Sequence, residues 1–247
     1  MELAIISNIH GNLVALRSVL DDIDSNGIKP EDIICAGDVA LMGVQGPRCL
    51  RMLQRDEIPT VKGNTDRWIA DYDKLLAEGK LEAGSSLARA VEWTRNQLGE
   101  EAVAYLGDLP PQMIVQSGNG AGDLQIVHGT PRSDEEGFMA GDNDQRPLNL
   151  AAGSTAYAVI GAHTHRSFAR MVGGMLIANA GSVGRSYEGR AGRATYLAVH
   201  DRTGLWHVDI RQVHYDSRRA YREILDSDLP LDSKYTESLL TAAAPAV

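Results

Sequence analysis

The first sixty residues repeat one pattern, in which a short apolar run is followed by a polar loop and then by an amphipathic stretch. The apolar runs are Leu3–Ile6, Asp32–Ala36 and Pro59–Val61. After the first run, apolar residues from Leu13 to Ile23 fall at spacings of three and four, which is typical of an amphipathic helix. The pattern recurs about every 27 residues, the length of a strand–helix–strand unit. Because a crossover helix separates parallel neighbours, the three runs are predicted to be parallel, buried strands.

The rest of the chain changes character twice. Residues 66–108 lose the strand signals and carry leucines at helical spacing, broken by glycines, which predicts a small helical insertion. From residue 112 the strand runs return, and glycine-rich turns between several of them indicate hairpins, so this half is predicted to be largely antiparallel. Residues 212–247 are predicted to form a C-terminal helical extension. We expect a single α/β domain over residues 1–247, because no low-complexity linker divides the chain.

Composition excludes several classes of protein. The 247 residues are 43% hydrophobic and 23% charged, which supplies a globular core and argues against disorder. A net charge of −9 argues against an extended nucleic-acid surface and against an anionic membrane as partner. Two cysteines exclude a disulfide framework and a cysteine-rich zinc site. No apolar run is long enough to span a membrane, and the first residues lack the basic region of a signal peptide, so a cytoplasmic location is expected.

Five polar loops directly follow predicted strands. They are Asn8-Ile9-His10, Gly37-Asp38, Gly63-Asn64-Thr65-Asp66, His128-Gly129 and His163-Thr164-His165. Each loop alone has a simpler interpretation, since Gly-Asp is usually a turn and a lone histidine is usually a hydrogen-bonded loop residue. Together they offer carboxylate, amide and imidazole ligands at the strand ends where α/β proteins bind ligands. The order of the five loops therefore favours a metal site, in which one aspartate can bridge two ions.

This order of loops resembles the calcineurin-like metallophosphoesterases, whose pattern runs D-x-H, G-D, G-N-H-D, H and G-H-x-H. The resemblance covers residues 3 to about 200 and includes Asn179–Val183, which is similar to the Asn-Pro-Gly-Ser segment of that family. The short chain and its Ile-His-Gly-Asn opening resemble the small bacterial and archaeal phosphodiesterase-like branch. The resemblance implies an α/β fold of two facing mixed β-sheets flanked by helices, a four-layer αββα sandwich.

The resemblance also implies that these loops hold two divalent transition metals, either Mn, Fe, Ni or Zn. The first ion would be held by Asn8, His10, Asp38 and His165, and the second by Asp38, Asn64, His128 and His163. A metal-bound hydroxide between the ions would attack phosphorus in line. The implied reaction is the metal-dependent hydrolysis of a small phosphodiester.

Two positions depart from the family pattern. Asn8 stands where the family has Asp, so the first site loses a negative charge and is predicted to bind metal weakly. Thr65 stands where many members have the histidine that protonates the leaving group, and a threonine hydroxyl has no useful pKa near neutrality. Asn64 and Thr65 thus occupy the implied catalytic positions, and the missing imidazole favours diesters or good leaving groups. Asp66 is then predicted only to cap the helix that follows it.

Three further functions stay open. A phosphomonoesterase is mildly disfavoured by Thr65, because an alkoxide leaving group needs a proton. A nucleotide pyrophosphatase, of the kind that acts on diadenosine tetraphosphate, is the second alternative. The third is a catalytically weak protein that binds a metal or another ligand, because Asn8 replaces the usual acid.

Arginines follow the metal loops closely and are candidates to bind the phosphate of the substrate. They are Arg67 and Arg132, with Arg166 and Arg185 as further candidates. For each arginine the alternative is a solvated or salt-bridged loop residue. The expected partner is therefore a small phosphoester, and the sequence does not indicate an oligomeric state.

Overall fold

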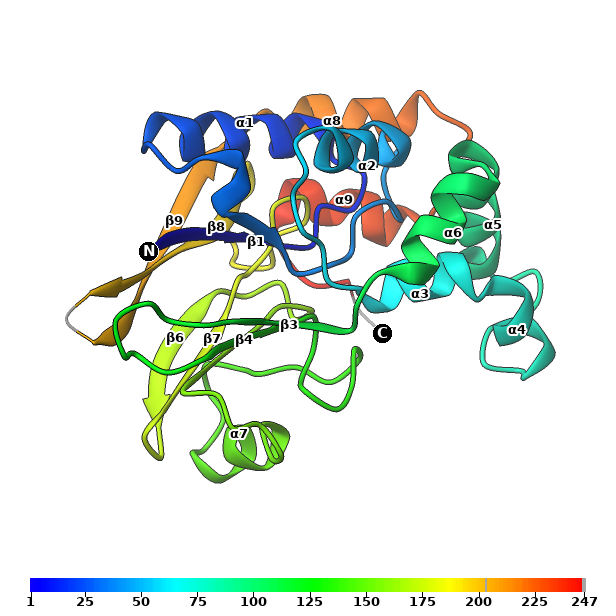
Figure 1. Ribbon diagram of the computed structural model, residues 1–247. Helices are drawn as coiled ribbons and strands as arrows, with labels where there is room; N and C mark the ends of the chain where they lie inside the picture. The colour runs from blue at the N-terminus through cyan, green and yellow to red at the C-terminus, as the bar shows by residue number, and fades with distance from the viewer. Residues whose placement is uncertain (203, 246–247) are drawn as a thin grey trace.

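Two mixed β-sheets form the centre of the computed structural model, which describes residues 1–202 and 204–245 (Figure 1). The first sheet has the strand order β2-β1-β8-β9. Its strands are β1 (Glu2–Ile6), β2 (Ile33–Cys35), β8 (Arg193–Arg202) and β9 (Leu205–His214). Strand β1 pairs with β2 in parallel and with β8 in antiparallel, and β8 pairs with β9 in antiparallel. The first strand of the chain therefore lies between an early and a late segment.

The second sheet has the strand order β3-β4-β5-β7-β6. Its strands are β3 (Gln112–Val115), β4 (Leu124–Val127), β5 (Ala158–Gly161), β6 (Phe168–Val172) and β7 (Met175–Asn179). The three central strands run parallel, and the two edge strands pair with them in antiparallel. Parallel strands need a long crossover, and the connection from β4 to β5 supplies one that contains α7 (Gln145–Leu150).

The prediction of a largely antiparallel second half is therefore only partly right. It holds for the pairs β3–β4, β6–β7 and β8–β9, which the glycine-rich turns indicated. It fails for β4–β5 because helix α7 is short and its helical spacing too weak to reveal the crossover, and for β5–β7 because the intervening strand β6 lies on the outer edge of β7. The predicted strand Pro59–Val61 is also wrong: within it only Thr60 forms a bridge, with Cys35. Pro59 has no N–H to donate to a neighbouring strand.

Helices cover the outer faces of both sheets and gather at one end of them (Figure 1). Their bounds are α1 (Leu13–Ser25), α2 (Gly46–Arg55), α3 (Asn64–Ala70), α4 (Tyr72–Ala77), α5 (Ser86–Leu98), α6 (Glu100–Asp108), α8 (Ser217–Leu225) and α9 (Ser233–Thr241), with a 3-10 turn at Pro30–Asp32. The arrangement confirms the predicted α/β sandwich of two mixed sheets flanked by helices.

Helices α3 to α6 occupy the segment predicted as an insertion, and α8 and α9 lie in the predicted extension. The division into one domain with these boundaries stays a prediction. None of the described helices is long and apolar enough to cross a membrane.

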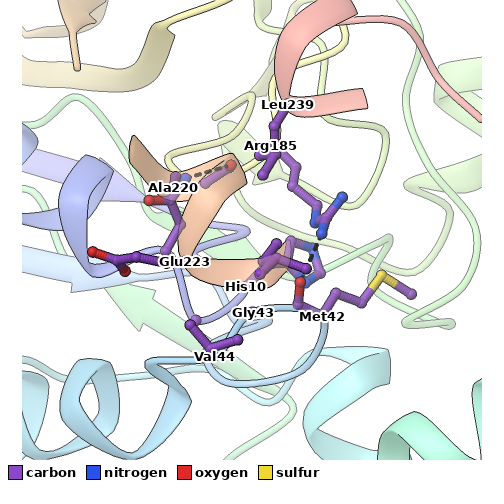
Figure 2. A pocket seen from close by; sticks show the side chains of 12 residues that line it. His10, Met42, Gly43, Val44, Arg185, Ala220, Glu223 and Leu239 are labelled. Atoms are coloured by element: carbon purple, nitrogen blue, oxygen red, sulfur yellow. Dashed lines mark hydrogen bonds between the residues drawn. The ribbon is translucent and has the colours of Figure 1, made fainter. Parts of the chain in front are cut away.

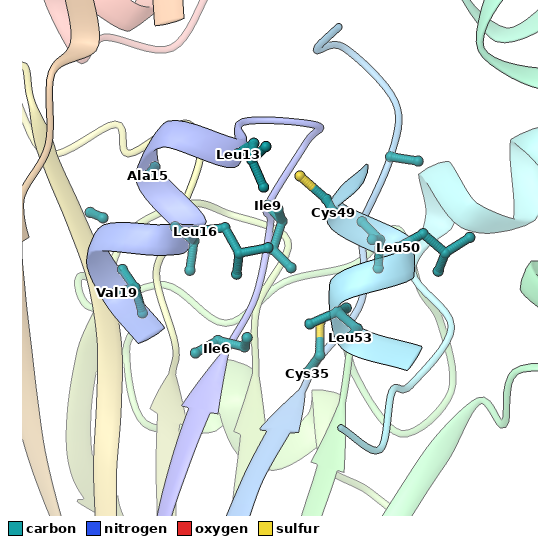
Figure 3. Packing of buried hydrophobic residues seen from close by; sticks show 14 of the residues in the cluster. Ile6, Ile9, Leu13, Ala15, Leu16, Val19, Cys35, Cys49, Leu50 and Leu53 are labelled. Atoms are coloured by element: carbon teal, nitrogen blue, oxygen red, sulfur yellow. The ribbon is translucent and has the colours of Figure 1, made fainter. Parts of the chain in front are cut away.

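Alternation along the strands separates the core into layers. In β1, Leu3 and Ile5 pack between the two sheets, whereas Ala4 and Ile6 face the helices. Figure 3 shows the helix-facing layer, where α1 and α2 place leucines over the ends of β1 and β2. A third cluster joins α7 to the outer face of the second sheet. Because both faces of β1 are covered, the loop that follows it starts from a fixed position.

Loss of the inter-sheet contact at Ile5 is expected to destabilise the whole sandwich. Ile5 is fully buried, so Ile5→Ala removes apolar contacts and leaves a cavity, at a cost of about 2–5 kcal/mol in the free energy of unfolding. The matched control is Ile114→Ala on edge strand β3, where the side chain is 50% exposed and the expected change is under about 0.5 kcal/mol. Urea unfolding measures both, and equal losses would contradict the layered core.

Candidate metal centre

The loops after β1, β2, β4 and β5 and the start of α3 bring six of the seven predicted metal ligands into contact with one another, and the seventh, Asn8, lies two residues before His10. The ligands after the first sheet's strands are Asn8, His10 and Asp38, those after the second sheet's strands are His128, His163 and His165, and Asn64 begins α3. Six of the seven are buried, and His163 is partly buried. The cluster therefore lies where the carboxyl ends of parallel strands from both sheets meet.

Five of these ligands have a left-handed backbone, which side chains other than glycine rarely adopt. Their φ angles are 51° for Asn8, 49° for His10, 63° for Asp38, 59° for His163 and 59° for His165. Such conformations cost free energy and persist only where the surrounding structure imposes them. Their concentration at one place marks the cluster as a functional site.

Two glycines allow the loops to approach one another closely. A Cβ atom on Gly63 would lie 2.2 Å from Asp38 Oδ1, and one on Gly37 would lie 2.6 Å from the Gly63 nitrogen. Neither distance is possible for a real side chain. The glycines of the Gly-Asp and Gly-Asn motifs are therefore required by the packing of the loops around Asp38.

Backbone carbonyls fix the orientation of three imidazoles. Each Nδ1 lies at a carbonyl oxygen, with distances of 3.2 Å from His10 to Leu41, 2.7 Å from His128 to Ala36 and 2.6 Å from His165 to Arg185. Because a carbonyl only accepts, Nδ1 carries the proton and Nε2 keeps its lone pair. This second contact is typical of histidines that bind metal through the other nitrogen.

The Nε2 lone pairs point at other acceptors. His10 Nε2 lies 3.2 Å from His165 Nε2, and His128 Nε2 lies 3.0 Å from Asn64 Oδ1. Neither pair has a proton to share when Nδ1 donates to its carbonyl. The ligand atoms of His10, Asp38 and His165 all lie within 4.8 Å of one another. A divalent cation fits these contacts because it satisfies several acceptors at once.

Asp38 lies between the two groups of ligands. Its Oδ2 is 3.5 Å from Nε2 of both His10 and His128. On the far side, Asn64 Oδ1 is 3.0 Å from His163 Nδ1 as well as from His128. The arrangement fits two neighbouring cation sites that share the Asp38 carboxylate.

Asn8 presents a free oxygen in the same cluster. Its Nδ2 donates to the Gly181 carbonyl at 2.7 Å and, more weakly, to Ser7 Oγ at 3.3 Å. Its Oδ1 is buried and has no hydrogen-bond partner among the described residues. An orphaned acceptor of this kind is costly unless something supplies positive charge. Asn8 is thus suited to ligate a cation through its amide oxygen.

Comparison with known proteins identifies the family of the domain that holds this site. The model of the calcineurin-like phosphoesterase superfamily domain matches residues 1–203. The chain belongs to that superfamily. Its loops and ligands therefore lie in a phosphoesterase domain, as the order of the motifs predicted.

Proteins similar to this chain come from archaea and bacteria. An uncharacterised protein of Methanocaldococcus jannaschii is 26% identical over 244 residues, which cover 92% of this chain and 93% of that protein. A metallophosphoesterase from Sphaerobacter thermophilus, known from a crystal structure, has 25% sequence identity to this chain. The two structures match with a TM-score of 0.76 over 98% of this chain and 100% of that one. A hypothetical protein of Pyrococcus horikoshii shares the fold, with 20% identity, a TM-score of 0.82 and 99% of both chains covered.

Burial sets the protonation state of the histidines and of Asp38 in this cluster. It lowers the pKa of His165 to about 3 and that of His10 well below its usual value, so both imidazoles are neutral near pH 7. Burial also raises the pKa of Asp38 to about 6, although the hydrogen bond from the Thr65 N–H at 2.9 Å favours the carboxylate. A dication beside Asp38 would oppose the effect of burial, because positive charge stabilises the ionised carboxylate.

Asp66 has a larger role than the helix cap that the sequence predicted. Its carboxylate accepts the backbone N–H groups of Asp38 at 2.8 Å, Val39 at 3.0 Å and Gly63 at 3.0 Å. These bonds hold the start of α3 against the loop after β2, and so fix the backbone that carries Asp38. The contacts span 27 and 28 residues, which no local spacing rule could reveal.

The predicted substrate arginines lie in ion pairs. Arg67 contacts Asp134 at 2.6 Å and Glu135 at 2.8 Å, and these partners raise its pKa. Arg132 pairs with Glu136 at 2.7 Å on the surface. In both residues the guanidinium is already engaged by carboxylates, and a role in binding phosphate stays a prediction.

Substitution of Asp66 is expected to loosen the Asp38 loop. In Asp66→Asn one acceptor oxygen becomes a donor, so at least one of the three backbone N–H groups loses its partner. We expect the free energy of unfolding to fall by about 1–3 kcal/mol and metal affinity to fall with it. The control is Asp228→Asn, because that exposed side chain accepts the Trp93 Nε1–H at 2.9 Å and an amide oxygen can replace it in that contact. Chemical unfolding and equilibrium dialysis against Mn²⁺ measure both effects, and equal results for the two variants would contradict the role of Asp66.

Asn8→Asp is expected to separate stability from metal affinity. The new carboxylate places an acceptor 2.7 Å from the Gly181 carbonyl, where Asn8 now donates, so the metal-free protein should lose about 1–3 kcal/mol. The added negative charge should tighten binding of the first ion. Asn96→Asp, on the exposed face of α5, controls for the charge itself. Thermal unfolding without metal is the decisive measurement, and an unchanged melting temperature would mean that Gly181 does not hold the Asn8 amide.

Proposed function

We propose that this phosphoesterase hydrolyses a phosphodiester with the help of two divalent transition-metal ions at the centre described above. The observation that carries the proposal is the convergence of the His10 and His128 Nε2 lone pairs on Asp38. The Nδ1 atoms of His10, His128 and His165 are each anchored to a backbone carbonyl. Imidazole lone pairs that face one another and a carboxylate repel, and a bound cation would relieve this repulsion. Family membership supports hydrolysis of a phosphoester as the reaction.

The ligand set indicates which ions the centre holds. Four imidazoles with one carboxylate and two amide oxygens suit Mn, Fe, Ni or Zn, because imidazole is a poor ligand for Mg and Ca. The first ion would be held by Asn8, His10, Asp38 and His165, and the second by Asp38, Asn64, His128 and His163. When bound, the ions supply Lewis acidity that polarises the phosphoryl oxygens and acidifies water.

The chain's own residues favour a diester over a monoester. The four imidazoles of the centre are committed as ligands, and the position beside Asn64 is Thr65, whose backbone N–H orients Asp38. A threonine hydroxyl is too weak an acid to protonate an alkoxide that leaves. The reaction therefore suits substrates whose leaving group needs no proton, and a diester brings less negative charge to the nucleophile than a monoester does.

A nucleotide pyrophosphatase is a second candidate for the same reason. A nucleotide that leaves through its phosphate is a good leaving group, so it does not need the acid that Thr65 fails to supply. A solved structure described as a putative diadenosine tetraphosphatase shares the fold, with 16% identity and a TM-score of 0.53 over 85% of this chain and 93% of that one. That likeness shows the fold alone, so the substrate must decide between the two candidates.

The reaction is tested by reconstituting metal-free protein with each of the four ions in turn. We expect hydrolysis of bis(p-nitrophenyl) phosphate, with p-nitrophenyl phosphate turned over more slowly, and loss of activity on chelation. Faster turnover of diadenosine tetraphosphate would favour the pyrophosphatase. Metal binding without hydrolysis of any of these substrates would contradict the proposed enzyme and support a binding protein.

A histidine variant links activity to the centre. His165→Asn keeps a residue type that tolerates the left-handed backbone but removes an imidazole ligand, so we expect activity to fall at least about 100-fold. His207→Asn is the control, because His207 stacks on His200 across β8 and β9 instead of joining the cluster. Steady-state assays at fixed metal concentration compare them. Equal activity in both variants would place the reaction elsewhere.

A further inference from the structure

Arg185 connects the C-terminal helix to the first metal site. We propose that it is a positioning residue that sets the affinity of the first ion. Its guanidinium ties α9 to the loop behind His10, and its backbone carbonyl orients His165. This inference rests on the proposed function, since it concerns the metal site. It assigns a role to α9, which lies beyond the residues 1–203 that the family model matches.

The guanidinium of Arg185 is buried and lacks a carboxylate partner. Only 2% of the residue is exposed, and none of the ion pairs among the described residues includes it. Burial lowers its pKa. Burying an unpaired charge is costly, so fixed dipoles must compensate it. The positions of the oxygens that do so are therefore strongly constrained.

Those oxygens come from two segments far apart in the chain. On the α9 side, Nη1 donates to Ser238 Oγ at 3.0 Å and to the Tyr235 carbonyl. On the other side, Nη2 donates to the Met42 carbonyl at 2.6 Å. Figure 2 shows Arg185 between Leu239 of α9 and Met42, with the imidazole of His10 beside them. The planar fork of an arginine can reach both sides at once.

The Met42 carbonyl is one residue away from the carbonyl that orients His10. The preceding carbonyl, that of Leu41, accepts the Nδ1–H of His10 at 3.2 Å. Met42 itself has a left-handed backbone, with φ of 72°. Because adjacent peptide planes share a Cα atom, a shift of the Met42 carbonyl moves the Leu41 carbonyl that orients His10. Arg185 therefore acts on the imidazole through the backbone of this loop.

The backbone of Arg185 leads directly to His165. Its carbonyl accepts the His165 Nδ1–H at 2.6 Å. Its N–H donates to Ser182 Oγ at 2.8 Å, and that hydroxyl donates to the Asn8 carbonyl at 2.9 Å. One residue thus has hydrogen-bonded connections to three of the four residues predicted to hold the first ion.

The space around Arg185 argues against a role in binding substrate from this side. The cavity it lines with His10, Met42 and Glu223 leaves about 10 Å³ for the centre of a water-sized sphere, which is about the least that one water molecule needs. Glu223 lies at the same cavity but pairs with Arg219 at 3.1 Å. This narrow space favours positioning over substrate binding as the function of the buried guanidinium.

Charge and positioning predict opposite effects on metal affinity. A positive guanidinium near a dication opposes binding, so Arg185→Met should tighten the first site if charge alone matters. If Arg185 positions His10 and His165, the same variant should weaken it. Arg185→Lys keeps the charge but loses the fork that reaches both sides. Ser238→Ala removes one bond at α9 and leaves the arginine in place.

The test is binding of Mn²⁺ to the full chain. Calorimetry measures the affinity of each site, and the electron paramagnetic resonance signal of a coupled ion pair reports whether both sites are filled. We expect Arg185→Lys and Arg185→Met to weaken the first site about 10-fold or more, with a smaller loss in Ser238→Ala and the second site retained. The controls are Arg219→Lys and Thr241→Ala. Thr241 lies on α9, and its hydroxyl donates to the Glu237 carbonyl and accepts the Ala243 N–H.

The outcomes distinguish this inference from the proposed function. Wild-type protein that binds no Mn²⁺, Fe²⁺, Ni²⁺ or Zn²⁺ would overturn both. Two ions in the wild type with unchanged first-site affinity in the folded variants would overturn only the role of Arg185, as would tighter binding in Arg185→Met. Equal weakening of both sites would show a merely structural role and would also overturn it. If the arginine variants do not fold, Ser238→Ala decides the question.

Discussion

The contact between His10 Nε2 and His165 Nε2, at 3.2 Å, is the constraint on which the rest of the centre depends. Two neutral imidazoles do not bring their lone pairs together unless the protein holds them there. The carbonyls of Leu41 and Arg185 at the two Nδ1 atoms hold them, and both histidines have a left-handed backbone. The fold thus stores unfavourable contacts that a cation would relieve, which is how a protein prepares a metal site before the metal binds.

The candidate ligands of this site could be selected from the sequence, whereas the residues that support them could not. The order of loops after apolar runs was enough to select the seven residues that the structure brings together, because each ligand follows a strand end or, at Asn64, a bridge. Asp66 and Arg185 acquire their roles through contacts between segments 27 to 143 residues apart. Such contacts depend on how the layers pack, which local patterns do not encode.

The same distinction explains the errors in the fold. Turn glycines correctly indicated the antiparallel pairs, because a hairpin is a local structure. The parallel pair β4–β5 depends on a crossover that includes only a short helix, and periodicity is weak over so few residues. The parallel pair β5–β7 depends on the placement of β6 at the outer edge of the sheet, which is not a local feature. Pro59–Val61 has a strand-like composition, yet its proline leaves room for one bridge only. Tertiary context decided both cases.

Asn8 and Arg185 together change the charge of the centre. Asp38 is the only carboxylate among the seven ligands, and Asn8 contributes a neutral oxygen whose amide is already matched to the Gly181 carbonyl. Arg185 adds a buried positive charge close behind His10 and His165. A centre with so little negative charge leaves bound dications with a strong field toward an anion. That field attracts phosphate esters in general and does not distinguish diesters from monoesters. Because the supports reach from Asn8 to Ser238, metal affinity and the docking of α9 are linked in both directions.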